Sequence, residues 1–220
     1  DDNLYHPYLI EFDEVIIEQK TSYLSDFIQN ITQEKLVSHR AGRWAFDEKY
    51  LSILNTLGYC VDCSVTPYVS WANILGAPNG HGGTDYSKFP STPYFMDYNN
   101  ISKEGTSSFL QVPVTILPAG YLEQVPEKLD KPTWLRPNGK NLNQMKLILN
   151  YASMHNYDCV EFMLHSSELM PGGSPTFKTE DEIEKLYRDL SELFALASKM
   201  FSGITLKEYY QFKVETKNEQ

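Results

Sequence analysis

The sequence has little positive charge, and it lacks any long apolar run. Its 19 Lys and Arg stand against 29 Asp and Glu, which gives a formal net charge of −10. Nucleic acids and anionic membranes are bound through basic surfaces, so the acidic balance argues against both as partners. No stretch of about 18 apolar residues is present, and no basic and apolar leader opens the chain. We therefore expect a protein without a membrane span that works in the cytoplasm.

Cysteine is also scarce, with three residues in the chain, Cys60, Cys63 and Cys159. Cys60 and Cys63 have the spacing of a redox or zinc pair. The sequence lacks the second pair that would complete a zinc site, and no helix start follows that would activate a thiol. The pattern therefore favours cysteines packed in apolar strands.

The remaining composition is that of a folded domain. Hydrophobic residues make up 41% and charged residues 22% of the 220 residues, which is enough apolar surface for a core and too much for disorder. We expect one domain over residues 1–220. Helical periodicity alternates with short runs of β-forming residues, and this alternation predicts an α/β fold.

Apolar spacing and turn residues indicate where the elements lie. Asp47 can cap a helix that Gly58 ends, and Thr179 and Glu182 form a capping box. The Pro- and Gly-rich residues 66–109 predict a long irregular insertion. The polar residues 215–220 are expected to form a frayed tail. The patterns predict helices over 13–29, 47–57, 142–155 and 179–201, a short final helix, and strands over 36–39, 59–65, 110–117 and 160–165.

The most informative segment is the run from Val160 to His165, which leads into a Gly- and Pro-rich loop. It predicts a short buried strand that ends on a histidine. The loops beyond the carboxyl ends of strands form the binding crevice in α/β folds, and an imidazole exchanges protons near neutral pH. His165 is therefore a candidate for proton transfer, with a purely structural strand-end histidine as the alternative.

Two more polar residues accompany predicted strand ends. Strand ends on one face of a parallel sheet converge, so we expect Arg40, Asp62 and His165 to share one pocket. A buried Asp62 can orient an imidazole, and Arg40 can hold another carboxylate in its charged form. A loop-end ion pair for Arg40 and a turn cap for Asp62 remain as alternatives.

These segments resemble the NodB-homology polysaccharide deacetylases, or carbohydrate esterase family 4. The likeness rests on His39-Arg40-Ala41-Gly42-Arg43-Trp44, on residues 58–67, and on the His165 segment with Pro171-Gly172-Gly173-Ser174-Pro175. It is closest to the branch linked to bacterial surface-polysaccharide and lipopolysaccharide biosynthesis, and it runs from about Asp13 to Tyr209. The resemblance implies a distorted (β/α) barrel, here incomplete at its N-terminus.

The resemblance also implies a chemistry, the removal of N-acetyl groups from a sugar or polysaccharide with a divalent metal, usually zinc. His165 would be the general acid, Asp62 would tune it, and Arg40 would position a base that this chain does not supply. Tryptophans suit a sugar face but equally suit a core. The residues expected at the sugar are Trp44, Trp134 and Arg136.

The chain departs from the family at its beginning. Family members carry an acidic motif and a histidine pair that supply the base and the metal ligands, yet no two of the five histidines here are three or four residues apart. Asp1-Asp2 looks like the acidic motif but has no strand ahead of it. His6 is either a remnant of the loop that follows the family's histidine pair or an ordinary loop histidine. The metal ligands are therefore not identifiable. Missing strands would leave an open sheet edge, which makes a homo-oligomer one expectation.

Two other functions stay open. A carbohydrate-binding or scaffold domain without catalysis would explain the absent metal motifs, although it leaves the retained acid-site residues unexplained. A barrel glycosidase would need two carboxyl groups about 5–10 Å apart, and Glu161 and Glu168 flank the His165 segment.

Overall fold

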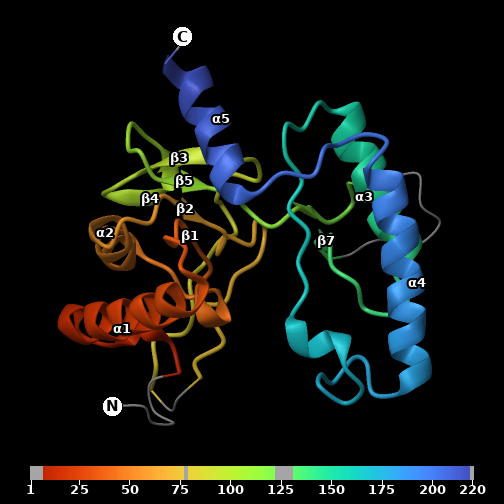
Figure 1. Cartoon of the computed structure of the whole chain (residues 1–220), viewed down its shortest axis with the longest axis horizontal. Coiled ribbons are helices and arrows are strands. Elements are labelled where there is room, and N and C mark those ends of the chain that lie inside the picture. Colours follow the sequence, from red (N-terminus) through yellow and green to blue (C-terminus); the bar gives the residue numbers. More distant parts are fainter. Residues whose placement is uncertain (1–6, 77–78, 122–130, 219–220) are drawn as a thin grey trace. The chain divides into compact units, whose positions relative to one another are not determined.

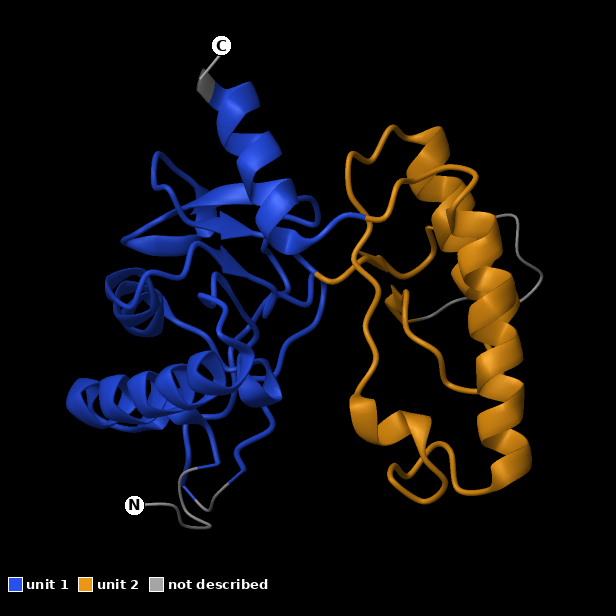
Figure 2. Ribbon diagram, viewed as in Figure 1, with its two compact units in different colours: residues 1–113, 204–220 blue, residues 114–203 orange. Residues whose placement is uncertain are grey.

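The chain forms two compact units with a mixed α/β fold. The computed structural model describes residues 7–76, 79–121 and 131–218 (Figure 1). Unit 1 comprises residues 1–113 and 204–220, and unit 2 comprises residues 114–203 (Figure 2). The predicted α/β class is confirmed. The single domain expected over residues 1–220 stays a prediction.

Unit 1 is built on a five-stranded sheet with the order β1-β2-β5-β3-β4. β1, β2 and β5 are parallel, whereas β3 is antiparallel to both β5 and β4. The described strands form an open sheet, and no closed barrel is found among them. The strands are β1 (Ser38–His39), β2 (Val61–Asp62), β3 (Tyr94–Asp97), β4 (Asn100–Glu104) and β5 (Leu110–Gln111).

The described part of unit 1 contains the α-helices α1 (Glu14–Thr32), α2 (Glu48–Thr56) and α5 (Leu206–Asn218), and the short 3₁₀ helices Leu9–Glu11 and Gly42–Trp44. The predicted limits of α2 are confirmed, because the Asp47 carboxylate accepts a hydrogen bond from the Tyr50 amide at 2.8 Å and Gly58 takes the left-handed conformation after the last turn. α2 connects the parallel strands β1 and β2, as such a pair requires. The core between helices and sheet includes Ile17, Phe46, Leu51, Leu54, Met96 and Phe109.

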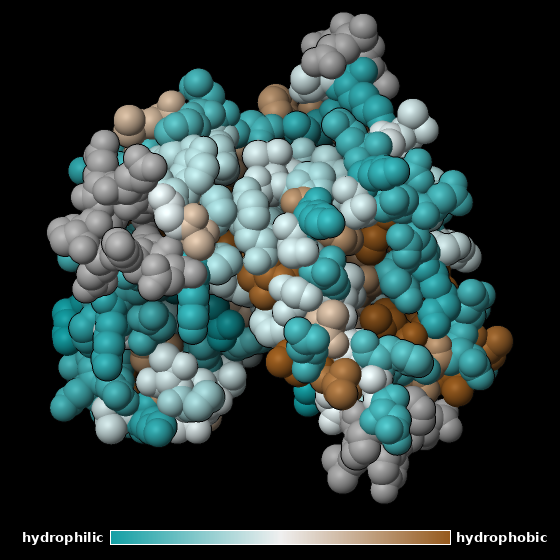
Figure 3. All heavy atoms as spheres, turned by 180° about the vertical axis from the view of Figure 1, so that it is seen from behind, coloured by the Kyte–Doolittle hydropathy of each residue, from teal (hydrophilic) through white to brown (hydrophobic). Residues whose placement is uncertain are grey.

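α1 turns many of its apolar side chains outward. The predicted helix is confirmed, but its buried face carries Thr21 and Ser25 beside Ile17. The Ser25 hydroxyl lies 2.7 Å from the Tyr59 hydroxyl, so this face meets polar groups of the core. Apolar atoms reach the surface of unit 1 in Figure 3, toward the lower right. The exposed large apolar side chains of α1 are Val15, Tyr23, Leu24, Phe27 and Ile31.

Two sequence predictions in unit 1 are wrong in part. The segment 66–109 was expected to be irregular, but β3 and β4 form an antiparallel hairpin within it. The residues 215–220 were expected to fray, but α5 continues through Asn218. α5 packs against the rest of unit 1. The Tyr210 hydroxyl donates to the Ser108 carbonyl at 2.9 Å, and the Lys217 ammonium lies 4.2 Å from the centre of the Phe95 ring.

Unit 2 pairs two helices with a short β-ladder. β6 (Ile116–Leu117) is antiparallel to β7 (Thr133–Trp134), and α3 (Leu142–Met154) packs on α4 (Glu180–Ala197). The capping box that opens α4 is confirmed, with the Glu182 amide donating to the Thr179 hydroxyl at 3.3 Å. The helix ends at Ala197, earlier than the predicted 201. The apolar core of this unit includes Leu117, Leu135, Met145, Ile148, Leu149 and Leu193.

The strand predicted over 160–165 does not form. Isolated hydrogen bonds hold this segment, from the Thr115 amide to the Glu161 carbonyl at 3.1 Å and from the Met163 amide to the Leu135 carbonyl at 3.2 Å. The Glu161 amide donates to the Thr115 hydroxyl instead of a carbonyl, which interrupts a regular ladder. The predicted strand 110–117 likewise splits into β5 and β6 around Pro113, which has no N–H to donate,.

Candidate functional site

A row of polar residues crosses the sheet of unit 1. His39 is in register with Asp62, Asp62 with Gln111, and Gln111 with Tyr94. Residues in register on neighbouring strands share one face of a sheet. The first three stand at the carboxyl ends of three parallel strands, which is where α/β folds place their binding sites.

Asp62 is the centre of this row, and its side chain is completely buried. Its carboxylate accepts a hydrogen bond from His39 Nδ1 at 2.8 Å, from the Ser64 amide at 2.7 Å and from the Ser64 hydroxyl at 2.8 Å. The Ala41 amide in turn donates to the Ser64 hydroxyl at 2.7 Å. Asp62 therefore ties the end of β2 to the loop that follows Arg40.

His39 connects Asp62 to a buried tyrosine. Its Nε2 lies 2.9 Å from the Tyr50 hydroxyl, which donates to a neutral imidazole or accepts from a protonated one. Burial raises the pKa of Tyr50 to about 12, and the nearby Asp62 charge adds to the effect. The Tyr50 hydroxyl therefore stays protonated at neutral pH, so the carboxylate, the imidazole and the phenol form one continuous hydrogen-bonded chain.

Gln111 stands beside Asp62 with its amide buried. No described residue makes a hydrogen bond to its Nε2 or Oε1 atom. A buried amide without partners destabilises a fold by about 1–3 kcal/mol, and such exceptions are rare enough to require a reason. On the next strand, burial and the Asp62 charge raise the pKa of Tyr94 far above its usual value. The row thus places the Asp62 carboxylate, which accepts three hydrogen bonds, beside a buried Gln111 amide without a hydrogen-bond partner among the described residues.

Arg40 follows β1, so it stands at the same sheet edge as Asp62 on the neighbouring strand. Its guanidinium carbon lies 5.7 Å from the centre of the Trp44 ring. Trp44 is 8% exposed and therefore offers little of its face to a sugar. Arg43 and Trp44 both have left-handed backbone angles, with φ of 54° and 61°. Such strained residues gather at functional sites.

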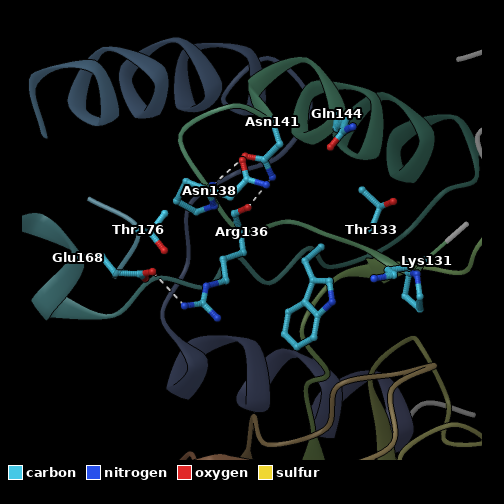
Figure 4. Close-up of a pocket in the computed structure, with 11 residues that line it drawn as sticks. Lys131, Thr133, Arg136, Asn138, Asn141, Gln144, Glu168 and Thr176 are labelled. Carbon is cyan, nitrogen blue, oxygen red and sulfur yellow. Dashed lines mark hydrogen bonds and ion pairs between the residues drawn. The ribbon is translucent and has the colours of Figure 1, made fainter. Parts of the chain in front are cut away.

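A second site lies in unit 2, a pocket of about 620 Å³ (Figure 4). It contains Trp134 and Arg136, which the sequence predicts at the sugar together with Trp44; because Trp44 belongs to unit 1, a sugar site shared by all three stays a prediction. Its walls combine an aromatic ring, amide side chains, hydroxyl groups and charged groups. The lining residues are Lys131, Pro132, Thr133, Trp134, Arg136, Pro137, Asn138, Asn141, Gln144, Glu168 and Thr176.

Hydrogen bonds fix the polar wall of this pocket. The Asn141 side chain, which precedes α3, donates to the Arg136 carbonyl at 2.7 Å and accepts from the Asn138 amide at 2.9 Å. The Arg136 guanidinium contacts Glu168 Oε1 at 2.9 Å, and Figure 4 shows the two side chains directed at each other. The Glu168 side chain is only 3% exposed. The wall therefore contains an ion pair between a buried carboxylate and a half-buried guanidinium.

His165 precedes the 3₁₀ turn Ser166–Leu169 that carries Glu168. It is an exposed residue of unit 2. Because Arg40 and Asp62 belong to unit 1, the convergence of all three residues stays a prediction. The imidazole that the structure does place against Asp62 is that of His39.

Sequence reasoning assigned no site role to His39 or Gln111, and it considered Glu168 only as one carboxylate of a possible glycosidase pair. His39 had a usable signal, since it ends the predicted strand 36–39 directly before Arg40. Gln111 had none, because it lies near the start of the predicted strand 110–117. Glu168 follows His165 by three residues, the spacing of a helix-opening capping box. Their partners could not be read from the sequence, because the spacing along the chain does not specify which distant side chain each one meets.

The described residues do not fit the zinc that the resemblance implies. Among them, no three His, Cys, Asp or Glu side chains are grouped so that they could hold a metal ion. His6 and Asp1-Asp2, which the sequence offered as possible remnants of the metal motifs, lie outside the described residues. The chain's own described side chains therefore supply the polar row and the pocket, but no metal centre.

Comparison of the chain with models of protein families, with curated proteins and with solved structures finds no match in any of the three. The resemblance to polysaccharide deacetylases therefore depends on the quoted motifs alone. In the part of the chain that the structure describes, no helix is both long and apolar enough to cross a membrane.

Proposed function

We propose that this chain is a polysaccharide-deacetylase-like domain that acts on an N-acetylated sugar or polysaccharide. One observation supports the proposal most directly: the completely buried Asp62 carboxylate ends a parallel strand beside the strand that leads to Arg40. This is the arrangement that the two motifs of the resemblance require. The distorted barrel that goes with such a function is part of the proposal.

The proposed roles follow from the chemistry of each side chain. Hydrolysis of an acetamide leaves an amine, whose nitrogen must receive a proton. We assign that proton to the imidazole of His165, as the resemblance implies. Asp62, held by His39 and Ser64, would tune the acid, and Arg40 would position a base. The metal that the resemblance includes has no ligand set among the described residues, so its place in the reaction is left open.

The pocket of unit 2 suits a saccharide. Sugar rings stack their apolar faces on aromatic side chains and offer hydroxyl groups to amides and charged groups, and the pocket holds Trp134 among Asn138, Asn141 and Gln144. An acetamido group adds one donor and one acceptor, which side-chain amides can match. A pocket of about 620 Å³ lies within the size range of small-molecule sites,.

The pocket also supports a second candidate function, carbohydrate binding without hydrolysis. Every contact just named would serve binding alone. The two functions differ in one product: only the deacetylase releases acetate.

The experiment incubates the full chain with di-N-acetylchitobiose, with and without added Zn²⁺, and measures released acetate together with binding by calorimetry. We expect Trp134→Ala to weaken binding about tenfold, which corresponds to about 1.4 kcal/mol. Tyr187→Ala, at an exposed tyrosine of α4, is the matched control and should bind normally. Binding without acetate in either condition would favour the second candidate. No binding to the unmodified chain would refute both with this sugar.

A further inference from the structure

Glu168 is a buried carboxylate whose two oxygens hold different parts of unit 2. Oε1 contacts the Arg136 guanidinium at 2.9 Å, and Oε2 accepts a hydrogen bond from the His165 backbone amide at 2.9 Å. We infer that Arg136 and Glu168 are positioning residues for His165 and transmit the state of the pocket to it. This inference rests on the proposed function, in which the pocket binds the sugar and His165 donates a proton.

Two hydrogen bonds connect the His165 backbone to Glu168. Its amide donates to the Glu168 carboxylate, and its carbonyl accepts from the Glu168 amide, also at 2.9 Å. One residue therefore fixes the peptide groups on both sides of His165. The side chain of His165 leaves from this fixed backbone, so Glu168 fixes the direction of its Cα–Cβ bond.

The second step connects Glu168 to the pocket. The Arg136 side chain is 31% exposed, whereas that of Glu168 is 3% exposed. A sugar in the pocket can therefore contact the guanidinium of Arg136, whereas the Glu168 carboxylate is too buried to be contacted directly. An arginine has five N–H donors, so it can bind a sugar oxygen while it keeps its bond to Glu168. The guanidinium is the only charged group in contact with Glu168 among the described residues.

The third step is the rigidity of the frame around Arg136. Its carbonyl is held by Asn141 at 2.7 Å. The preceding residue, Leu135, donates its amide to the Thr115 carbonyl at 2.9 Å. Because the backbone around Arg136 is held by these hydrogen bonds, a ligand that pulls the guanidinium moves the Arg136–Glu168 contact instead of the backbone. The change then reaches His165 through a single carboxylate.

A simple local cap is the competing explanation. A 3₁₀ turn opened by a capping box needs Glu168 but does not need Arg136. The distinguishing feature is distance along the chain, because Arg136 lies far from His165 in sequence and Glu168 contacts both of them. A change at Arg136 that alters the His165 amide therefore separates positioning from capping.

The first experiment measures amide hydrogen exchange at His165 in the ¹⁵N-labelled full chain without ligand. We expect Arg136→Gln and Glu168→Gln each to speed exchange about 10- to 100-fold, the range for losing a hydrogen bond to a charged group. Arg136→Lys keeps a positive charge beside the Glu168 carboxylate and should restore most of the protection of the His165 amide. Arg188→Gln and Glu184→Gln remove the same groups from an exposed pair on α4 and should leave His165 unchanged.

Unchanged exchange in Arg136→Gln, with the spectrum of a folded protein, would overturn the inference. If Arg136→Gln fails to fold, Glu168→Gln decides, because unchanged exchange at the His165 amide in that folded variant would also overturn the inference.

The second experiment adds di-N-acetylchitobiose. We expect the sugar to shift the His165 amide resonance in the unmodified chain and in Arg188→Gln, but not in Arg136→Gln. If the sugar binds at Trp134 and the His165 amide stays in place, the transmission is refuted while the proposed function stands. If the sugar does not bind at all, the proposed function fails with this ligand, and the ligand-free exchange still decides whether Arg136 and Glu168 position His165.

Discussion

Replacing His39 by phenylalanine tests whether Asp62 depends on an imidazole partner. The His39 side chain is 12% exposed and the Asp62 side chain 0% exposed, so water cannot readily replace the lost hydrogen bond. Phenylalanine keeps the ring that now packs edge-on against Tyr50, with ring centres 4.8 Å apart. The substitution therefore removes hydrogen bonds without opening a cavity.

The magnitude follows from the two hydrogen bonds that His39 makes. The bond to a carboxylate contributes about 1.5–3 kcal/mol, and the bond to the Tyr50 hydroxyl contributes about 1 kcal/mol. Asp62 keeps its two bonds from Ser64, so the carboxylate is not left without partners. We expect His39→Phe to lower the free energy of unfolding by about 2.5–4 kcal/mol.

Urea unfolding followed by circular dichroism measures this change. His81→Phe, at an exposed histidine of the same unit, is the control and should change stability by less than about 0.5 kcal/mol. A double-mutant cycle with Asp62→Asn should give a coupling energy of about 1.5–3 kcal/mol. A loss below about 1 kcal/mol in His39→Phe, or a coupling near zero, would refute the view that the imidazole stabilises the Asp62 carboxylate.

Three further predictions concern single side chains. The pKa of Tyr50 is raised to about 12 from its ordinary value of 10, so its contribution to stability is present below pH 10 and is lost as the pH rises toward 12; tyrosinate absorbance of the folded protein and of Tyr50→Phe checks this. Hydrogen bonds from the Lys178 and Thr179 amides lower the pKa of Glu182 below 4.5, so the first turn of α4 should keep its protection from amide exchange above pH 4.5 and lose it as the pH falls further. Gln111→Leu should raise the free energy of unfolding by about 1–2 kcal/mol, because it removes a buried amide that no described residue satisfies,; a loss of stability in urea unfolding would mean that the amide has a partner.

Local chemistry in the sequence was enough to place several elements. Asp47 and Gly58 bound α2, and Thr179 with Glu182 opens α4, because a cap is made by residues within one turn of the helix end,. In each case the interacting groups are close along the chain.

Local patterns failed where a partner came from far away. The apolar spacing of α1 predicted a helix correctly but did not reveal that Phe27 and Ile31 are exposed while Thr21 and Ser25 face the core. The core at this helix contains the hydroxyl groups of Tyr50 and Tyr59. Polar groups of the core thus decided which face of the helix was buried.

The sequence by itself determined the α/β class and most helix limits, and it placed Asp62 at a strand end. Tertiary structure alone decided that Asp62 meets His39, that Gln111 lies beside it with a buried amide, and that Glu168 joins Arg136 to the His165 backbone. The physical reason is that caps and periodicity act over a few residues, whereas strand register and ion pairs join residues 23 to 49 positions apart, and only the packed chain brings those together.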